Sequence, residues 1–465
     1  MSRRECQPNR ALKALLDRVG MSNSRLAKEV NDLAAQAELR TGYNHSSVTR
    51  WLNGDTPRGR VPILIATVIG RQIRHPVTVD EIGMGTGNRP PGLEFPRDRA
   101  EAIATTQAYW RGEDTTDRGF VAAYYTVPFQ RWQTSQADEL PISGQPSEEP
   151  VLRVGWQDVQ RLRAFAEQAR AWDASLGGDA WHRGAVTDFL RNQVAALLSV
   201  SQGDGIGREL FTIAAELSRV AGWAAVDAGH GGVGQCHLIQ ALRLARAGGD
   251  IETGTYVLAT MALHTLLEGA PEQALDMVEG AFARGRQHGA AAPRVLAFAK
   301  LVEARAHALL RDATSAAAAL TRAEKLLGKI TGDRDPSWIP YVTEGRLAAD
   351  ACEVYRDLRN PAAALRWNAE ATALSDLSGE RNPRAVGLRL AVVATAACQA
   401  RDLDQALAAG QQALDLLAPV ASARGREHLR AVVAAMQPWS GDTRVREFSR
   451  RAAQPAVLGA TKAAI

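Results

Sequence analysis

The chain has 465 residues, of which 46% are hydrophobic, 23% charged and 6% aromatic, and its formal net charge is +4. Such a composition is ordinary for a soluble globular protein, and the length predicts more than one domain at about 150 residues each. The four cysteines are widely spaced without a metal-ligand pattern, which favours reduced thiols. No signal peptide is evident, and the longest apolar run, 61–70, is shorter than the roughly 20 residues of a membrane span. We therefore expect a cytoplasmic protein with no membrane partner.

Three amphipathic runs within the first 73 residues predict helices that each bury one apolar stripe. The first stripe comprises Leu12, Leu15, Leu16 and Val19. The second comprises Leu26, Ala27, Val30, Leu33, Ala34 and Ala37, with Ser22 or Asn23 as the N-cap. The third comprises Val61, Leu64, Ile65, Val68, Ile69 and Ile73. Together with the segment between the second and third runs, these helices can close a small core.

That segment, 44–54, predicts the recognition helix of a helix-turn-helix. Asn44 is a suitable N-cap, and Asn53-Gly54 predicts a left-handed stop. The buried side is formed by Val48, Trp51 and Leu52. The remaining side chains can all hydrogen-bond, and we expect them to point outward and read DNA base edges: His45, Ser46, Ser47, Thr49 and Arg50.

Basic charge is concentrated in the same part of the chain. Residues 1–89 contain 14 lysines and arginines against 8 acidic residues, a net charge of +6, so the remainder of the chain has a net charge of −2. This asymmetry favours double-stranded DNA as the partner. We expect phosphate contacts from Arg25, Lys28, Thr56, Arg58 and Arg60. An ordinary helical hairpin with solvated polar faces is the alternative, but it leaves the charge asymmetry unexplained.

The pattern along the chain predicts four regions. The helix-turn-helix domain spans 1–85. A connecting region follows over 86–150, with a helix around 100–111, an apolar segment 120–132 and a flexible linker rich in Ser, Pro, Gln and acid over 133–150. A helical repeat domain spans 151–440, and a basic, mobile tail spans 441–465.

Alanine-rich amphipathic helices with recurring breaks predict the repeats. Four breaks are each followed by an Ala-Leu pair, and the leucines fall at 275, 320, 365 and 407, with gaps of 45, 45 and 42. The same design extends back through a break at 248–250. A helix pair cannot bury its apolar face alone, whereas stacked pairs can share a core. We predict an all-α fold with a tetratricopeptide-like superhelix; an irregular bundle would explain the composition but not the breaks.

No catalytic constellation is evident, so we expect no enzyme activity, no cofactor and no metal site. The glycine-rich run 229–234 lacks the preceding strand and the Gly-Lys-Ser/Thr of a phosphate loop, and we interpret it as a helix–helix turn. We interpret seven tryptophans as packing anchors, although a concave superhelix could hold a peptide or small molecule: Trp110, Trp132, Trp156, Trp172, Trp181, Trp223 and Trp338.

The motifs carry a family resemblance. Residues 23–31, 44–54 and 57–62 resemble the XRE-type (Cro/repressor-like) regulators of actinobacteria, and residues 215–228 and 240–247 resemble their tetratricopeptide-containing portion. Some of these regulators repress sporulation or antibiotic production in streptomycetes. The resemblance implies a transcriptional repressor of development or secondary metabolism.

We therefore expect a homodimer that places one recognition helix per subunit in successive major grooves. The repeats would mediate dimerisation or would sense a protein, peptide or small-molecule effector. A protein–protein interaction scaffold that uses the repeats without direct DNA binding is the alternative.

Overall fold

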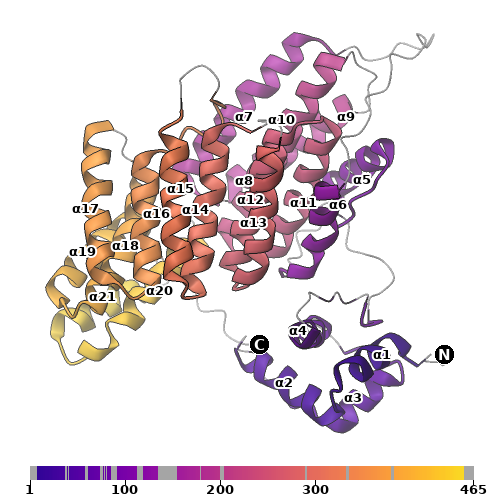
Figure 1. Ribbon diagram of the computed structural model, residues 1–465, viewed down its shortest axis with the longest axis horizontal. Coiled ribbons are helices and arrows are strands. Elements are labelled where there is room, and N and C mark those ends of the chain that lie inside the picture. The colour runs from indigo at the N-terminus through magenta and orange to yellow at the C-terminus, as the bar shows by residue number, and fades with distance from the viewer. Residues whose placement is uncertain are drawn as a thin grey trace.

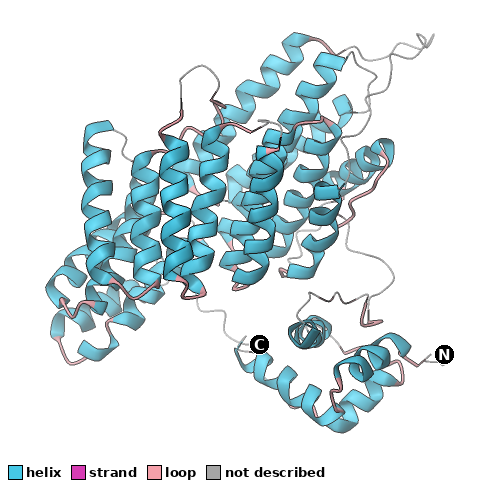
Figure 2. Cartoon of the chain, in the orientation of Figure 1, coloured by secondary structure: helices cyan, strands magenta, loops and turns pink. Residues whose placement is uncertain are grey.

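The computed structural model describes most of the chain: residues 8–36, 39, 41–57, 61–73, 77, 79, 81–84, 92–112, 119–134, 154–178, 180–198, 204–287, 291–330, 335–378, 382–420 and 422–454. Within these ranges all regular structure is helical, which confirms the all-α prediction (Figure 2). Figure 1 shows a small N-terminal module and a large body in which helix pairs stack into a superhelix.

The N-terminal module consists of four helices: α1 Arg10–Val19, α2 Asn23–Gln36, α3 His45–Leu52 and α4 Val61–Ile73. Its core is separate from that of the body and includes the fully buried side chains of Leu12, Leu26 and Ile65. The cap of α1 also closes the module, because the Asn9 side chain accepts from the Leu12 amide at 2.9 Å and donates to the Ile82 carbonyl at 2.8 Å. The predicted apolar stripes therefore form one core.

Residues 92–112 and 119–134 pack on the body, although the composition predicts that they belong to a connecting region. They contain α5 Arg99–Arg111, the 3-10 turn η1 Ala122–Tyr125 and α6 Thr126–Thr134. Gln240 donates to the Gly92 and Glu94 carbonyls at 2.8 and 3.0 Å, and Arg243 donates to the Pro96 carbonyl at 2.7 Å. Buried polar side chains thus fasten this segment onto the body.

Docking of α6 depends on one glycine of the body. A Cβ on Gly254 would lie 2.0 Å from the indole of Trp132, so only glycine allows the two to approach. Of the linker predicted over 133–150, Gln133 and Thr134 are helical, and residues 135–150 lie outside the described residues.

The body starts with α7 and the interrupted helix α8–η2–α9, in which η2 is a π-helical turn. Their bounds are α7 Trp156–Leu176, α8 Ala180–Phe189, η2 Leu190–Val194 and α9 Ala195–Leu198. Five antiparallel pairs follow: α10 Asp204–Ala228 with α11 Gly231–Ala247, α12 Ile251–Leu267 with α13 Pro271–Arg286, α14 Pro293–Leu309 with α15 Ala313–Leu327, α16 Glu344–Asp357 with α17 Pro361–Ser378, and α18 Pro383–Gln399 with α19 Leu403–Leu417. The body ends with α20 Ala423–Ala435, η4 Gln437–Trp439 and α21 Thr443–Ala452.

A shared turn explains the recurring breaks. Arg311, Arg359 and Arg401 have positive φ angles of 64°, 59° and 62°. The residue after each arginine is Asp or Asn, whose amide donates to the carbonyl five residues earlier at 2.9–3.0 Å. Each turn therefore ends one helix in a left-handed residue and caps the next with a side-chain acceptor.

One predicted break has a different place in the repeat. The turn at 248–250 has the same form but joins α11 to α12, which belong to successive pairs. The turn within the first pair is Gly229-His230, so the glycine-rich run is a helix–helix turn, as its sequence predicts.

The prediction of a mobile tail from 441 is wrong for residues 443–452, which form α21. Val445 and Phe448 are buried against α19 and α20. The stretch 441–465 contains four arginines and one lysine, and these obscure the apolar stripe that Val445, Phe448 and Ala452 form at spacings of three and four residues. Residues 455–465 lie outside the described residues.

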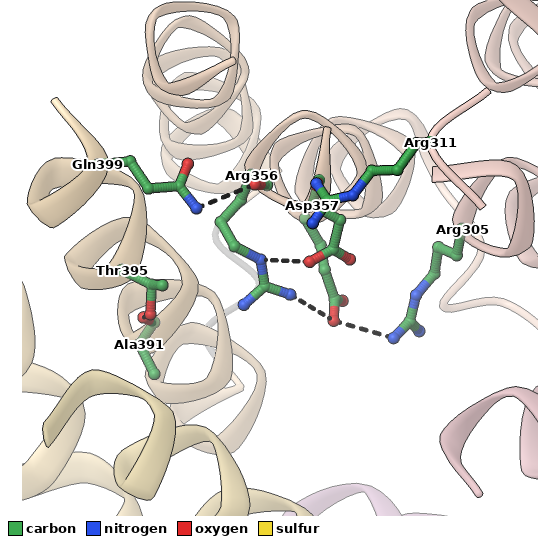
Figure 3. A network of polar contacts seen from close by, with 8 residues as sticks. Arg305, Arg311, Arg356, Asp357, Ala391, Thr395 and Gln399 are labelled. Carbon is green, nitrogen blue, oxygen red and sulfur yellow. Dashed lines mark hydrogen bonds and ion pairs between the residues drawn. The ribbon is translucent and has the colours of Figure 1, made fainter. Parts of the chain in front are cut away.

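Neighbouring pairs are also joined by buried charges (Figure 3). Glu353 on α16 accepts from Arg305 on α14 at 2.9 Å and lies 3.4 Å from Arg356 on its own helix. Gln399 on α18 donates to the Arg356 carbonyl at 3.1 Å. The burial of Glu353 would raise its pKa, but the surrounding arginines together hold that pKa well below its usual range. The carboxylate therefore stays ionised and links α14 to α16, while Gln399 joins α18 to the backbone of α16.

Candidate functional site

Helix α3 is held by a reciprocal cap and two apolar anchors. The Asn44 side chain accepts from the Ser47 amide at 3.1 Å, and the Ser47 hydroxyl accepts from the Asn44 amide at 3.4 Å. Val48 and Trp51 are buried in the module core, and the Trp51 ring packs edge-to-face on Tyr43 at 5.0 Å. The predicted N-cap and the buried Val48 and Trp51 are confirmed, whereas Leu52 is only partly buried.

The five side chains expected to read bases do not all lie on one exposed edge. His45, Ser46 and Arg50 are exposed. Ser47 is only 6% exposed and its hydroxyl belongs to the cap, so its predicted outward position is wrong. Thr49 is half-buried and donates to the His45 carbonyl at 3.0 Å. The sequence indicated the capping-box spacing, but Ser is found both at caps and on polar faces.

The start of α2 lies beside α3. Ser22 caps α2 by accepting from the Arg25 amide at 3.3 Å, and Asn23 donates to the Thr49 hydroxyl at 3.4 Å. The positive end of the α2 dipole therefore lies near the edge that carries Arg50.

Of the residues expected to contact phosphates, three lie in the described part of the chain. Arg25, Lys28 and Thr56 are all exposed. Arg25 forms a surface ion pair with Glu29 at 2.8 Å, which is weak enough for a phosphate to compete. Arg58 and Arg60 lie outside the described residues.

A second candidate site is a cavity of about 880 Å³ on the inner face of the superhelix. It is lined by residues of α7, of the first helix of each pair from α10 to α18, of the segment 327–343, of α17 and of α20. Aromatic rings supply much of its apolar wall: Trp223, Tyr256, Phe298, Trp338 and Tyr341. Trp223 and Trp338 pack against the core of the body, as predicted, and also line the cavity.

The cavity is closed where the first and last parts of the body meet. Asp227 on α10 is buried, lies 2.5 Å from Arg384 at the start of α18, and accepts from Ser422 before α20 at 3.0 Å. It also accepts from the Gly178 amide at 3.0 Å. Asn382 donates to the Ala174 carbonyl of α7 at 2.9 Å. One carboxylate thus joins segments that are almost 200 residues apart.

Burial shifts the pKa values of two titratable groups that line the cavity. Desolvation raises the pKa of Asp173 to about 6, against the lowering effect of Arg384 and Arg219. Desolvation lowers the pKa of His428 to about 3, although Glu353 opposes this shift. His428 is therefore neutral at pH 7, and Asp173 is mostly ionised.

The described residues contain neither a metal-binding cluster nor a membrane-spanning helix. No group of three histidines, cysteines or carboxylates there is placed to hold a metal ion. Among the described helices, none combines the length and apolarity that crossing a bilayer requires.

Residues 12–85 match the family model of the SP15 N-terminal domain. The match begins near the start of α1 and ends beyond α4, so it spans the N-terminal module and none of the superhelix. None of the curated proteins and none of the solved structures that were compared with the chain matches it. The match therefore concerns the N-terminal module alone.

Proposed function

We propose that the chain is a sequence-specific DNA-binding transcriptional regulator, in which α2 and α3 act as a helix-turn-helix and α3 enters the major groove. The observation that carries this proposal is the short, rigidly capped α3, whose exposed edge presents His45, Ser46 and Arg50. A helix held from behind with polar tips near its N-terminus has the form needed to reach base edges.

Charge and position support the phosphate contacts. Arg25 and Lys28 are exposed on α2, whose N-terminus lies beside α3, and Thr56 is exposed just after α3. Basic side chains and a helix N-terminus both favour phosphate oxygens. The basic pair Arg58 and Arg60 follows in the sequence.

The proposed regulator is a cytoplasmic homodimer, with half-sites about 34 Å apart along the duplex. The resemblance to XRE-type regulators favours repression of development or secondary metabolism. The superhelix would supply the dimer contact or the regulatory input, because α3 and its neighbours form a core separate from that of the body.

Selection of bound sequences from genomic fragments with the full-length chain, followed by fluorescence anisotropy on the selected site, tests the proposal. Arg50→Ala should weaken specific binding by about 1–3 kcal/mol and relax the preference at one base position. Lys28→Ala should weaken binding to all sequences and reduce the salt slope by about 1.

Lys13→Ala is the matched control, because Lys13 is an exposed base on α1 that already pairs with Asp17 at 3.3 Å. It should leave affinity and preference unchanged. Absence of any selected sequence, or equal affinity for all sequences with intact Arg50, would contradict the proposal.

The scaffold alternative predicts a different result. An extended protein partner needs an accessible inner face, whereas the inner face of the described superhelix is closed by the contacts of Asp227. If the full chain binds no DNA but retains one protein stoichiometrically, the scaffold function replaces the regulator.

A further inference from the structure

The cavity of the superhelix contains two kinds of arginine. Seven arginines and five acidic residues line it. Four of the arginines have a carboxylate partner: Arg170 with Glu216, Arg294 with Asp335, Arg346 with Asp350 and Arg384 with Asp227. The other three, Arg219, Arg389 and Arg424, form no ion pair or hydrogen bond with a carboxylate among the described residues. The charges of Asp173, Asp376 and Glu353 act on them, in that order, only at longer range. These three guanidinium groups therefore lack a direct carboxylate contact.

Arg219 is the clearest case of a buried guanidinium without a direct carboxylate contact. Its side chain comes from α10 and is 5% exposed, and its Nε has no hydrogen-bond acceptor. Its guanidinium lies 4.8 Å from the centre of the Tyr256 ring, a favourable contact that does not neutralise it. Burying an unpaired charge is costly, so this residue does not serve the stability of the empty body.

Arg424 and Arg389 reach the cavity from α20 and α18. The Nε of Arg424 is buried without an acceptor, and desolvation, reinforced by Arg305, lowers its pKa to about 10. Arg389 is satisfied only by neutral acceptors, the side-chain oxygens of Asn368 and Thr372, both at 2.7 Å. An incoming anion would improve the environment of both guanidinium groups.

The rest of the wall fits a flat apolar group. Tyr256 and Trp338 lie with ring centres 5.0 Å apart, and the Tyr256 and Tyr341 hydroxyls are hydrogen-bonded at 2.8 Å. Tyr341 is 37% exposed although it lines the cavity, so its ring is available to a ligand. A volume of about 880 Å³ is in the range of small-molecule sites, and the acidic wall residues disfavour a polyanion.

We propose that this cavity binds a small organic anion with an aromatic body, whose carboxylate or phosphate group is held by Arg219 and Arg424 while its ring lies against Tyr256, Trp338 and Tyr341. The role of this ligand as the effector rests on the proposed regulatory function, whereas its binding does not. In the regulator, occupancy would bridge α10 and α20, on the two sides of the closure at Asp227.

Isothermal titration calorimetry of the full-length chain without DNA tests the binding. The probes are 1-naphthyl phosphate, 1-naphthoate and the neutral 1-naphthol. We expect one anion to bind with 1:1 stoichiometry and 1-naphthol to bind at least about tenfold more weakly, because a charge-assisted hydrogen bond is lost. The preferred anion identifies the acid group as phosphate or carboxylate.

Variants then locate the site. Arg219→Met and Arg424→Met should each lower the affinity for the anion by about tenfold or more. Arg322→Met, at an exposed position on α15, should leave this affinity unchanged. Failure of both anions to bind, equal binding of 1-naphthol, or unchanged affinity in both cavity variants would overturn the proposal.

Thermal unfolding separates a ligand site from a structural role. Arg219→Met should keep or raise the Tm of the ligand-free chain, because it removes an unpaired buried charge. A lower Tm for this variant would show that Arg219 stabilises the body and would overturn its assignment. Since the titration contains no DNA, failure of the DNA-binding proposal leaves this result unaffected; if both hold, the anion also shifts the DNA affinity of the full chain.

Discussion

The N-terminal module and the superhelix use polar side chains in opposite ways. In the module, the core is apolar and the charged residues of α2 and α3 are exposed. In the superhelix, arginines and carboxylates such as Arg305, Glu353 and Asp227 are buried between helices. A module that binds a partner through its outer face needs exposed charges. Helix pairs that stack around a cavity need buried ion pairs, which fix the positions of the helices relative to one another.

This contrast shows which side chains determine the structure of each part. The module can be described by stripes of apolar residues and by its caps. In the superhelix, small alanines bring the helices close together, and long polar side chains then decide which distant segments meet. Arg384 and Asp227, for example, join α18 to α10.

The largest expected effect comes from the closure of the superhelix. Asp227→Ala leaves Arg384 buried without its carboxylate and removes the acceptor of Ser422 and Gly178. We expect the free energy of unfolding of the body to fall by about 3–5 kcal/mol. Calorimetric unfolding of the full chain would show the transition of the body at lower temperature, with the transition of the module unchanged.

The double variant Asp227→Ala/Arg384→Met is the control, because it removes both charges. It should recover much of the lost stability, since a missing pair costs less than an unpaired buried charge. Equal loss in the single and double variants would mean that packing, and not the charge pair, closes the superhelix.

A smaller effect is expected at acid pH from His428, which lines the cavity. Its pKa is lowered by burial to about 3, from about 6.5 in the unfolded chain, so the unfolded state binds the proton more strongly. The stability of the body should therefore decline as pH falls from 6.5 towards 3, with a slope of up to about 1.4 kcal/mol per pH unit.

His428→Gln should remove this part of the acid sensitivity. Asp173, whose raised pKa of about 6 acts in the opposite direction between pH 4 and 6, remains in the variant. The free energy of unfolding, measured with urea at several pH values, would separate the contribution of His428 from that of Asp173. Identical curves for the variant and the wild type would show that the pKa of His428 is not lowered in the folded state.

The sequence predicted the helices of the module well, because their signals are local. The cap at Asn44 and the buried Val48 and Trp51 follow from residue type and spacing, whereas the sequence left Ser22 and Asn23 both open as the cap of α2. The sequence did not predict that 92–112 and 119–134 pack on the body, nor which residues line the cavity, because both depend on which helices pack together in the folded chain. Arg219 and Trp223 lie one helical turn apart and share a face, but only the closed superhelix makes that face a cavity wall.

The smallest expected effect is the loss of one helix N-cap, which can be compared between the module and the body. Asn44 caps α3 and Asp402 caps α19, and each accepts from the amide three residues later, at 3.1 and 2.9 Å. Replacing either by alanine should cost about 1 kcal/mol of stability. Only Asn44→Ala should also weaken specific DNA binding, because fraying of α3 moves His45 and Ser46 while the body keeps its shape. Anisotropy titrations of both variants on the selected site would decide; equal losses of affinity would mean that α3 is not the element that reads DNA.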